Sequence, residues 1–101
     1  LMYRALFTLP LLASLLMAAC GTATPGFRGA DVSRHVVGAM TFDVRLRGDK
    51  AEAQRRNFGF GQKFPDVAAH AGIAIERASG CTIRRGTLTG DPAIVFARIN
   101  C

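Results

Sequence analysis

The fold class is set by the stretch Met40-Thr41-Phe42-Asp43-Val44-Arg45-Leu46-Arg47. Apolar and polar side chains alternate along it without interruption. Because successive side chains of a β-strand point to opposite faces, this alternation predicts a half-buried strand. We expect its apolar face to meet a core and its charged face to meet water. His35 and Val36 extend this strand, and Gly38 marks a bulge or a close backbone approach.

The segment after this strand, residues 50–56, allows two interpretations. Its residues are strong helix formers, and Asp49 with Glu52 three positions later imitates a capping box, which indicates a two-turn helix. A hairpin about Gly48 and Asp49 instead places Glu52 opposite Arg45 and turns the alanines of the segment toward the core. The hairpin is favoured because the strand runs directly into a Gly-Asp turn signal.

A helix is predicted over residues 65–79. Pro65 suits a first helical position, Asp66 lies in the first turn, and Gly80 stands just past the end. Apolar residues recur at helical spacing between them, at Val67, Ala71, Ala74, Ile75 and Ala78. The many alanines would let this helix lie close on a sheet.

Aromatic and glycine residues alternate over residues 57–64, just before the helix. We expect the rings of Phe58, Phe60 and Phe64 to fill the end of a small core. The alternative is a loop that stacks a ligand beside Arg55 and Arg56.

The last twenty-one residues predict a β-hairpin around the turn Thr89-Gly90-Asp91-Pro92. A turn centred at Asp91 places Cys81 opposite Cys101, Ile83 opposite Ile99 and Thr87 opposite Val95. Opposed residues lie near the Cα separation that a disulfide requires, so we expect a bond between Cys81 and Cys101. The predicted fold is α+β: a small antiparallel sheet of three or four strands, one main helix packed on it, and a C-terminal hairpin closed by the disulfide. The order of elements is β-β-α-β-β if the hairpin at Gly48 forms, and β-α-α-β-β if residues 50–56 are helical.

The first nineteen residues are typical of a secretory signal peptide. Residues 5–19 carry no charge and follow Arg4, the one basic side chain before them. A helix of this length reaches about 22 Å and falls short of the roughly 30 Å hydrocarbon core, so a permanent span is not expected. Translation is expected to start at Met2, or at Leu1 through an alternative start codon.

The end of this segment, Met17-Ala18-Ala19-Cys20, resembles the lipobox of bacterial lipoproteins. The resemblance implies that Cys20 becomes the first mature residue, that its thiol is diacylglycerylated, and that its new amine is acylated. Several acyl chains give stable membrane anchoring. Because Gly21 follows the cysteine, the resemblance implies the outer membrane, on its periplasmic side. The alternative is an ordinary signal, cut after Ala19 or at residues 21–23, and a periplasmic or secreted protein.

The predicted organisation is therefore a signal peptide (1–19), a lipidated cysteine with a flexible Gly/Pro-rich tether (20–35) and one small domain (36–101). Without Arg4 the mature chain has 12 basic and 7 acidic side chains, a net charge of +5. No basic run of the kind that binds nucleic acid is present. The adjacent pairs Arg55-Arg56 and Arg84-Arg85 are the candidates for an anionic lipid or envelope polymer, if the fold brings them together.

No catalytic constellation is recognised in the sequence. Ser33, Ser79, His35 and His70 are not spaced like a known site, and His70 has no second ligand at helical spacing. No cofactor, metal or catalytic residue is expected. The pattern Ala78-Ser79-Gly80-Cys81, with Gly86, Gly90-Asp91 and Cys101 after it, is similar to that of small bacterial envelope proteins without an assigned activity.

Three functions are thus carried forward. The first is a lipid-anchored structural or interaction protein of the bacterial envelope. The second is a soluble periplasmic or secreted binding module for an anionic envelope component. A small enzyme comes last.

Overall fold

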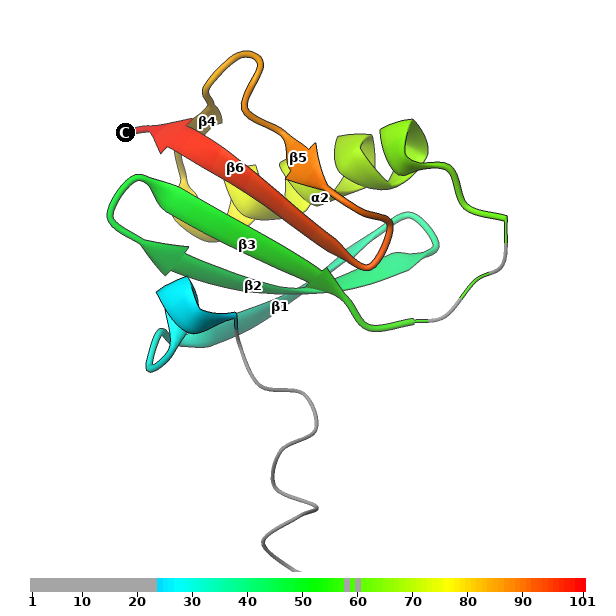
Figure 1. Ribbon diagram of the computed structural model, residues 1–101, viewed down its shortest axis with the longest axis horizontal. Coiled ribbons are helices and arrows are strands. Elements are labelled where there is room, and N and C mark those ends of the chain that lie inside the picture. Colours follow the sequence, from blue (N-terminus) through cyan, green and yellow to red (C-terminus); the bar gives the residue numbers. More distant parts are fainter. Residues whose placement is uncertain (1–23, 58, 60) are drawn as a thin grey trace, which may run out of the picture.

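The computed structural model describes residues 24–57, 59 and 61–101 (Figure 1). In chain order its elements are a short 3-10 helix η2 (Pro25–Phe27), strands β1 (Val32–Val37), β2 (Met40–Arg47) and β3 (Lys50–Arg55), helix α2 (Phe64–Ser79), and strands β4 (Thr82–Ile83), β5 (Thr89–Gly90) and β6 (Ile94–Asn100). The predicted α+β class is confirmed.

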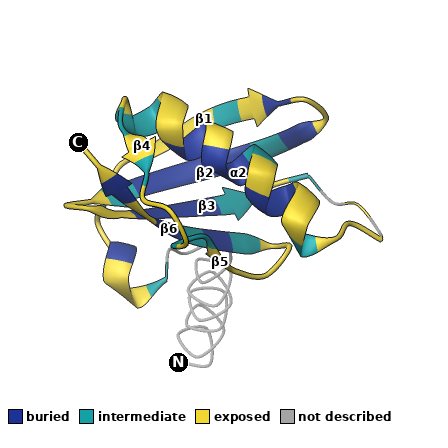
Figure 2. Cartoon of the chain, turned by 90° about the horizontal axis from the view of Figure 1, so that it is seen from above, coloured by how far each residue is buried: buried dark blue, intermediate teal, exposed yellow. Residues whose placement is uncertain are grey.

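The six strands form one curled antiparallel sheet in the order β1-β2-β3-β6-β4, with β5 also paired to β6. Helix α2 lies across one face, and buried residues fill the space between the two layers (Figure 2). Two features raise the number of strands above the three or four predicted. An additional strand, β1, precedes the first predicted one, and the arm before β6 is divided into β4 and β5.

Strand β2 matches the predicted strand over residues 40–47. The expected extension is wrong, because His35 and Val36 belong to β1, which folds back on β2 and places His35 opposite Phe42. Gly38 lies in the turn between these strands, with φ of 59°. The first residue of a tight two-residue hairpin turn of this kind needs a positive φ, which glycine adopts without strain.

The hairpin interpretation of residues 50–55 is confirmed. β3 pairs antiparallel with β2, and Glu52 lies opposite Arg45 as predicted. The helix alternative fails because Ala51 and Ala53 complete the apolar face of the sheet, with exposed fractions of 1% and 0%. This tertiary burial outweighs the local helix propensity of the segment.

Helix α2 begins at Phe64, one residue before the predicted start, and ends at Ser79 as predicted. Val67, Ala71, Ala74 and Ile75 are completely buried against the sheet. Gly80 ends the helix in the left-handed conformation, and its N–H donates to the Glu76 carbonyl at 2.9 Å. This is the C-terminal cap that glycine favours.

The predicted disulfide joins Cys81 and Cys101, with their Cα atoms 4.8 Å apart. The register at this end is also as predicted, since Ile83 pairs with Ile99. The predicted partner of Thr87 is wrong, because Gly90 is the residue opposite Val95.

A turn between β4 and β5 explains this difference. The Arg84 N–H still donates to the Arg98 carbonyl at 2.8 Å, and the Thr87 N–H donates to the Arg84 carbonyl at 3.2 Å. The loop that shifts the register by three therefore lies between Arg84 and Thr89.

The domain begins earlier than the predicted boundary at residue 36, so the expected tether is too long. Phe27 of η2 is only 5% exposed, and its ring stacks on Phe96 with centroids 6.3 Å apart. β1 then adds an edge strand from Val32 onward. Among the residues that the structure describes, no helix has both the length and the apolar character needed to cross a membrane.

Candidate functional site

Charged side chains are buried on the face of the sheet that points away from α2. The expectation that this face of β2 meets water is wrong for Asp43 and Arg45, which are 6% and 7% exposed. Glu52 on β3 is 1% exposed. The sheet curls around this face, and η2 packs over part of it through Phe27 (Figure 1).

Arg45 and Glu52 form a buried ion pair, with Arg45 Nη1 3.0 Å from Glu52 Oε1. The same nitrogen donates to Gln54 Oε1 at 3.2 Å. The second oxygen of Glu52 accepts the Thr24 hydroxyl and, at 3.4 Å, the Thr24 backbone N–H. Each charged group is thus supplied with partners, which is what a buried pair requires for stability. The pair ties the start of the domain to the centre of the sheet.

Asp43 is held by two arginines on either side. Arg34 Nε donates to Asp43 Oδ1 at 2.8 Å, and Arg56 Nε lies 3.4 Å from Asp43 Oδ2. The hydrogen bond from Arg34 is the main reason why the pKa of Asp43 is lowered, with further attraction from Arg34, Arg56 and Arg45, while burial acts in the opposite direction. This carboxylate is therefore ionised at neutral pH and neutralises the neighbouring cations.

Arg55 and Arg56 line a surface pocket of about 250 Å³ where β3 ends. Its other lining residues are Asn57, Gly59, Pro92 and Ala93, so no carboxylate lines it among the residues that the structure describes. Arg55 Nε is buried and has no hydrogen-bond partner within the described part of the chain. The two guanidinium groups give this pocket a positively charged lining, which suits a small anion. Phe58 and Phe60 lie outside the described residues, so the predicted roles of their rings are untested.

The two predicted arginine pairs do not come together. At one end of the β3–β6 ladder, the Arg55 N–H donates to the Ala93 carbonyl. At the other end, the Arg84 N–H donates to the carbonyl of Arg98, the residue that pairs with Lys50. Five residues of strand separate the two positions, which corresponds to about 17 Å. A single anion site built from all four arginines is therefore excluded.

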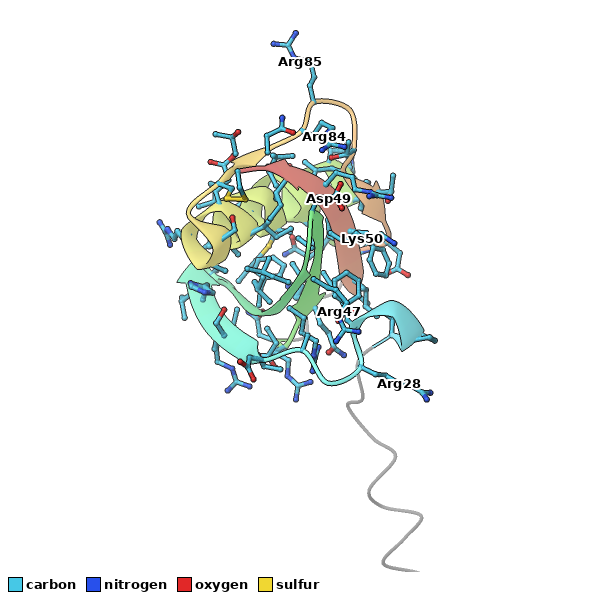
Figure 3. All side chains as sticks on the ribbon, turned by 90° about the vertical axis from the view of Figure 1, so that its left-hand side faces the viewer. Arg28, Arg47, Asp49, Lys50, Arg84 and Arg85 are labelled. Carbon is cyan, nitrogen blue, oxygen red and sulfur yellow. A yellow bond between two sulfur atoms is a disulfide. The ribbon has the colours of Figure 1, made fainter. Side chains whose placement is uncertain are left out.

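Arg84 and Arg85 belong instead to a group of basic side chains at the end of the sheet where β2 turns into β3 (Figure 3). We call this group the basic end, and its members are Arg28, Arg47, Lys50, Arg84, Arg85 and Arg98. Asp49 lies among them and accepts from Arg98 Nη1 at 3.0 Å, with Arg84 Nη2 at 3.6 Å. Hydrogen bonding from Arg98, with the charges of Arg98 and Arg84, lowers the pKa of Asp49.

The residues considered for catalysis serve local structure. His35 Nε2 lies 3.0 Å from Ser33 Oγ, and His70 Nδ1 lies 2.7 Å from the Asp66 carbonyl in its own helix. Ser79 Oγ accepts the Cys81 N–H at 3.0 Å. No group of three or more His, Cys, Asp or Glu side chains within residues 24–57, 59 and 61–101 is placed to hold a metal ion.

Cys20 and the rest of the predicted lipobox lie outside the described residues. The sequence reasoning placed Glu52 opposite Arg45 but missed the burial of this pair, and it missed the basic end. Comparison of the chain with protein-family models, with curated proteins and with solved structures found no match.

Proposed function

We propose that the protein is a lipid-anchored structural or interaction protein of the bacterial envelope, held by acyl chains on Cys20. The observation that carries this proposal is the disulfide between Cys81 and Cys101 in a domain that follows a lipobox-like segment. Disulfides persist in oxidising compartments outside the cytoplasm, which agrees with export directed by residues 1–19.

The short distance between the lipobox and the domain supports a position directly at the membrane. Thr24, four residues after Cys20, already bonds to Glu52 in the sheet. Four residues of fully extended chain span at most about 14 Å. A domain attached in this way lies beside the lipid headgroups and is not held away from them.

The intact mass of the protein from its native host, before and after thiol reduction, tests the proposal. We expect a chain that begins at Cys20, carries acyl mass, and gains two hydrogens on reduction. Cys20→Ser is the control, since it removes the acylated thiol and leaves every described residue unchanged. A mature chain without acyl mass would refute the anchoring.

A second candidate is a free exported binding module, and two observations favour it. The Thr24 nitrogen lies 3.4 Å from Glu52 Oε2, so a cut after Ala23 would place a new ammonium group against a buried carboxylate. The pocket at Arg55 and Arg56 offers this module an anion site.

The same mass spectrum separates the two candidates, because the second requires a chain without acyl mass, which starts at Thr24 if the cut falls after Ala23. Titration with inorganic phosphate then tests the pocket. We expect Arg55→Gln to abolish a heat of binding that Lys63→Gln leaves unchanged, since Lys63 does not line the pocket. No measurable heat with the original chain would remove the phosphate site.

A further inference from the structure

We propose that the basic end is a membrane-docking surface that binds the phosphate groups of anionic lipids. The inference rests on the proposed function, because the acyl chains on Cys20 would bring this surface to the bilayer. It adds a face, an orientation and a ligand class to the anchoring.

Half of the chain's basic side chains outside the signal segment gather at this end. Six of twelve lie there, and they come from three separate segments: Arg28 after η2, Arg47 and Lys50 at the β2–β3 turn, and Arg84, Arg85 and Arg98 from the β4–β6 region. In Figure 3 the labelled members extend from Arg85 at the top, past Arg84, Lys50 and Arg47, to Arg28 at the lower right. Asp49 is the acidic side chain bonded within the group.

Three of these cations are free to contact an external phosphate. Arg28, Lys50 and Arg85 are exposed, and within the described part of the chain their side chains make no hydrogen bond or ion pair. Lys and Arg side chains carry their charge on a long flexible stem, so they reach phosphates at different depths of a headgroup layer.

The other members hold the surface in shape. Arg47 Nη2 donates to the Arg28 carbonyl at 2.6 Å and fixes the chain after η2 to the β2–β3 turn. Arg98 and Arg84 meet at Asp49, which joins that turn to β6 and to the loop after β4. Three segments distant in sequence thereby present their charges on one rigid frame.

The attachment point favours a lipid surface over a soluble partner. Cys20 is at most about 14 Å from Thr24 along an extended chain, and the following residues lead through η2 to Arg28 within the basic end. The Debye length is roughly 8–10 Å at physiological ionic strength. When the basic end of a domain held this close faces the bilayer, its charges lie within about one Debye length of the headgroups. The anchor raises the local concentration of lipid phosphates far above that of a free ligand.

Vesicle cosedimentation of an unlipidated mature chain tests this surface separately from the lipid anchor. The protein is residues 20–101 with Cys20→Ser, which retains every described residue. We expect it to bind vesicles of equimolar phosphatidylcholine and phosphatidylglycerol and not to bind vesicles of pure phosphatidylcholine. Binding to the anionic vesicles should weaken as the salt concentration rises.

A matched pair of double variants locates the contact. Lys50→Gln with Arg85→Gln removes two charges from the basic end and is expected to weaken binding by about 25-fold, from about fivefold per cation. Lys63→Gln with Arg77→Gln removes one lysine and one arginine on and before α2, and is expected to weaken it by less than about threefold. Thermal unfolding of both variants confirms that each is folded.

Three outcomes would overturn the docking surface: equal losses in the two double variants, equal binding to neutral and anionic vesicles, or stronger competition by a soluble acidic polymer than by lipid. Each of them leaves the mass-spectrometric test of Cys20 unaffected. Absence of acyl mass on Cys20, with anionic vesicles still bound through Lys50 and Arg85, would instead refute the anchor and retain the surface.

Discussion

The buried pair of Arg45 and Glu52 makes a sharp prediction about stability. Their side chains are 9% and 1% exposed, so removal of one partner leaves the other charge in a site that water hardly reaches. Loss of one member of such a pair costs about 3–5 kcal/mol. A domain of this size has a free energy of unfolding of about 4–12 kcal/mol, so either Arg45→Met or Glu52→Leu should remove about a quarter of it or more.

The double variant with both changes is predicted to be nearly as stable as the original protein, within about 1–2 kcal/mol. Replacing both charges by apolar side chains of similar volume removes the desolvation cost together with the attraction. Urea unfolding followed by circular dichroism measures all three free energies, and the double-mutant cycle yields the coupling between the two residues.

Arg34→Met is the matched control on the neighbouring strand. Arg34 also bonds a buried carboxylate, but its own side chain is 62% exposed, and Arg56 remains beside Asp43. Its loss should cost much less than the loss of Arg45, because water screens an ion pair made by an exposed side chain. Two results would contradict this prediction: a loss of unfolding free energy in Arg45→Met no larger than in Arg34→Met, or a double variant no more stable than the single variants. Either result would show that an unpaired buried charge does not destabilise this domain.

Three further predictions concern other parts of the domain. Cys81→Ser with Cys101→Ser opens a loop of 20 residues and should lower stability by about 3 kcal/mol, measured as a fall of roughly 12–24 °C in Tm. Thiol reduction of the original protein should give the same fall, and an unchanged Tm would contradict the prediction. The pKa of Asp43 is lower in the folded protein than its unfolded value near 3.9, so its stabilising effect is present above that value and is lost as pH falls through the lower folded pKa. Asp43→Asn removes this titration, so its urea midpoint should fall less steeply than that of the original protein between about pH 6 and 2. Gly90→Ala would place a Cβ 2.2 Å from the Ile94 carbonyl oxygen and should cost several kcal/mol. Gly86→Ala is the control: its Cβ meets nothing within 4 Å, so it should cost only about 1–2 kcal/mol for its positive φ. Equal Tm values for the two variants would contradict this prediction.

Local patterns were sufficient to predict most of the fold. The period-two alternation of residues 40–47 and the turn glycine at Gly48 are signals contained in a few adjacent residues, and both appear in the structure as predicted. The same holds for α2, where Pro65 and Gly80 mark the two ends. The disulfide was also predicted, although the register beside the turn differs by three residues and the loop after Arg84 offsets this difference before Cys81.

The features that the sequence did not predict depend on contacts between distant segments. Whether Asp43 faces water depends on the curl of the sheet and on η2, which packs through Phe27 on Phe96. Neither the curl of the sheet nor the packing of η2 can be inferred from residues 40–47 alone. Likewise, the basic side chains are dispersed along the chain and become a group only because β2 and β6 end where β3 begins, at one end of the sheet.

The contact between Thr24 and Glu52 joins the processing of the chain to the stability of its domain. In a chain that begins at Cys20, the Thr24 nitrogen is a neutral amide, so Arg45 is the one cation bonded to Glu52 among the described residues. In a chain cut after Ala23, the same nitrogen is an ammonium 3.4 Å from Glu52 Oε2 and supplies a second cation. Arg45→Met should therefore cost about 3–5 kcal/mol in the longer chain and distinctly less in the shorter one. Urea unfolding of the two chains, each with and without the substitution, measures this difference, and equal costs would show that the Thr24 ammonium does not replace the guanidinium as a partner of Glu52.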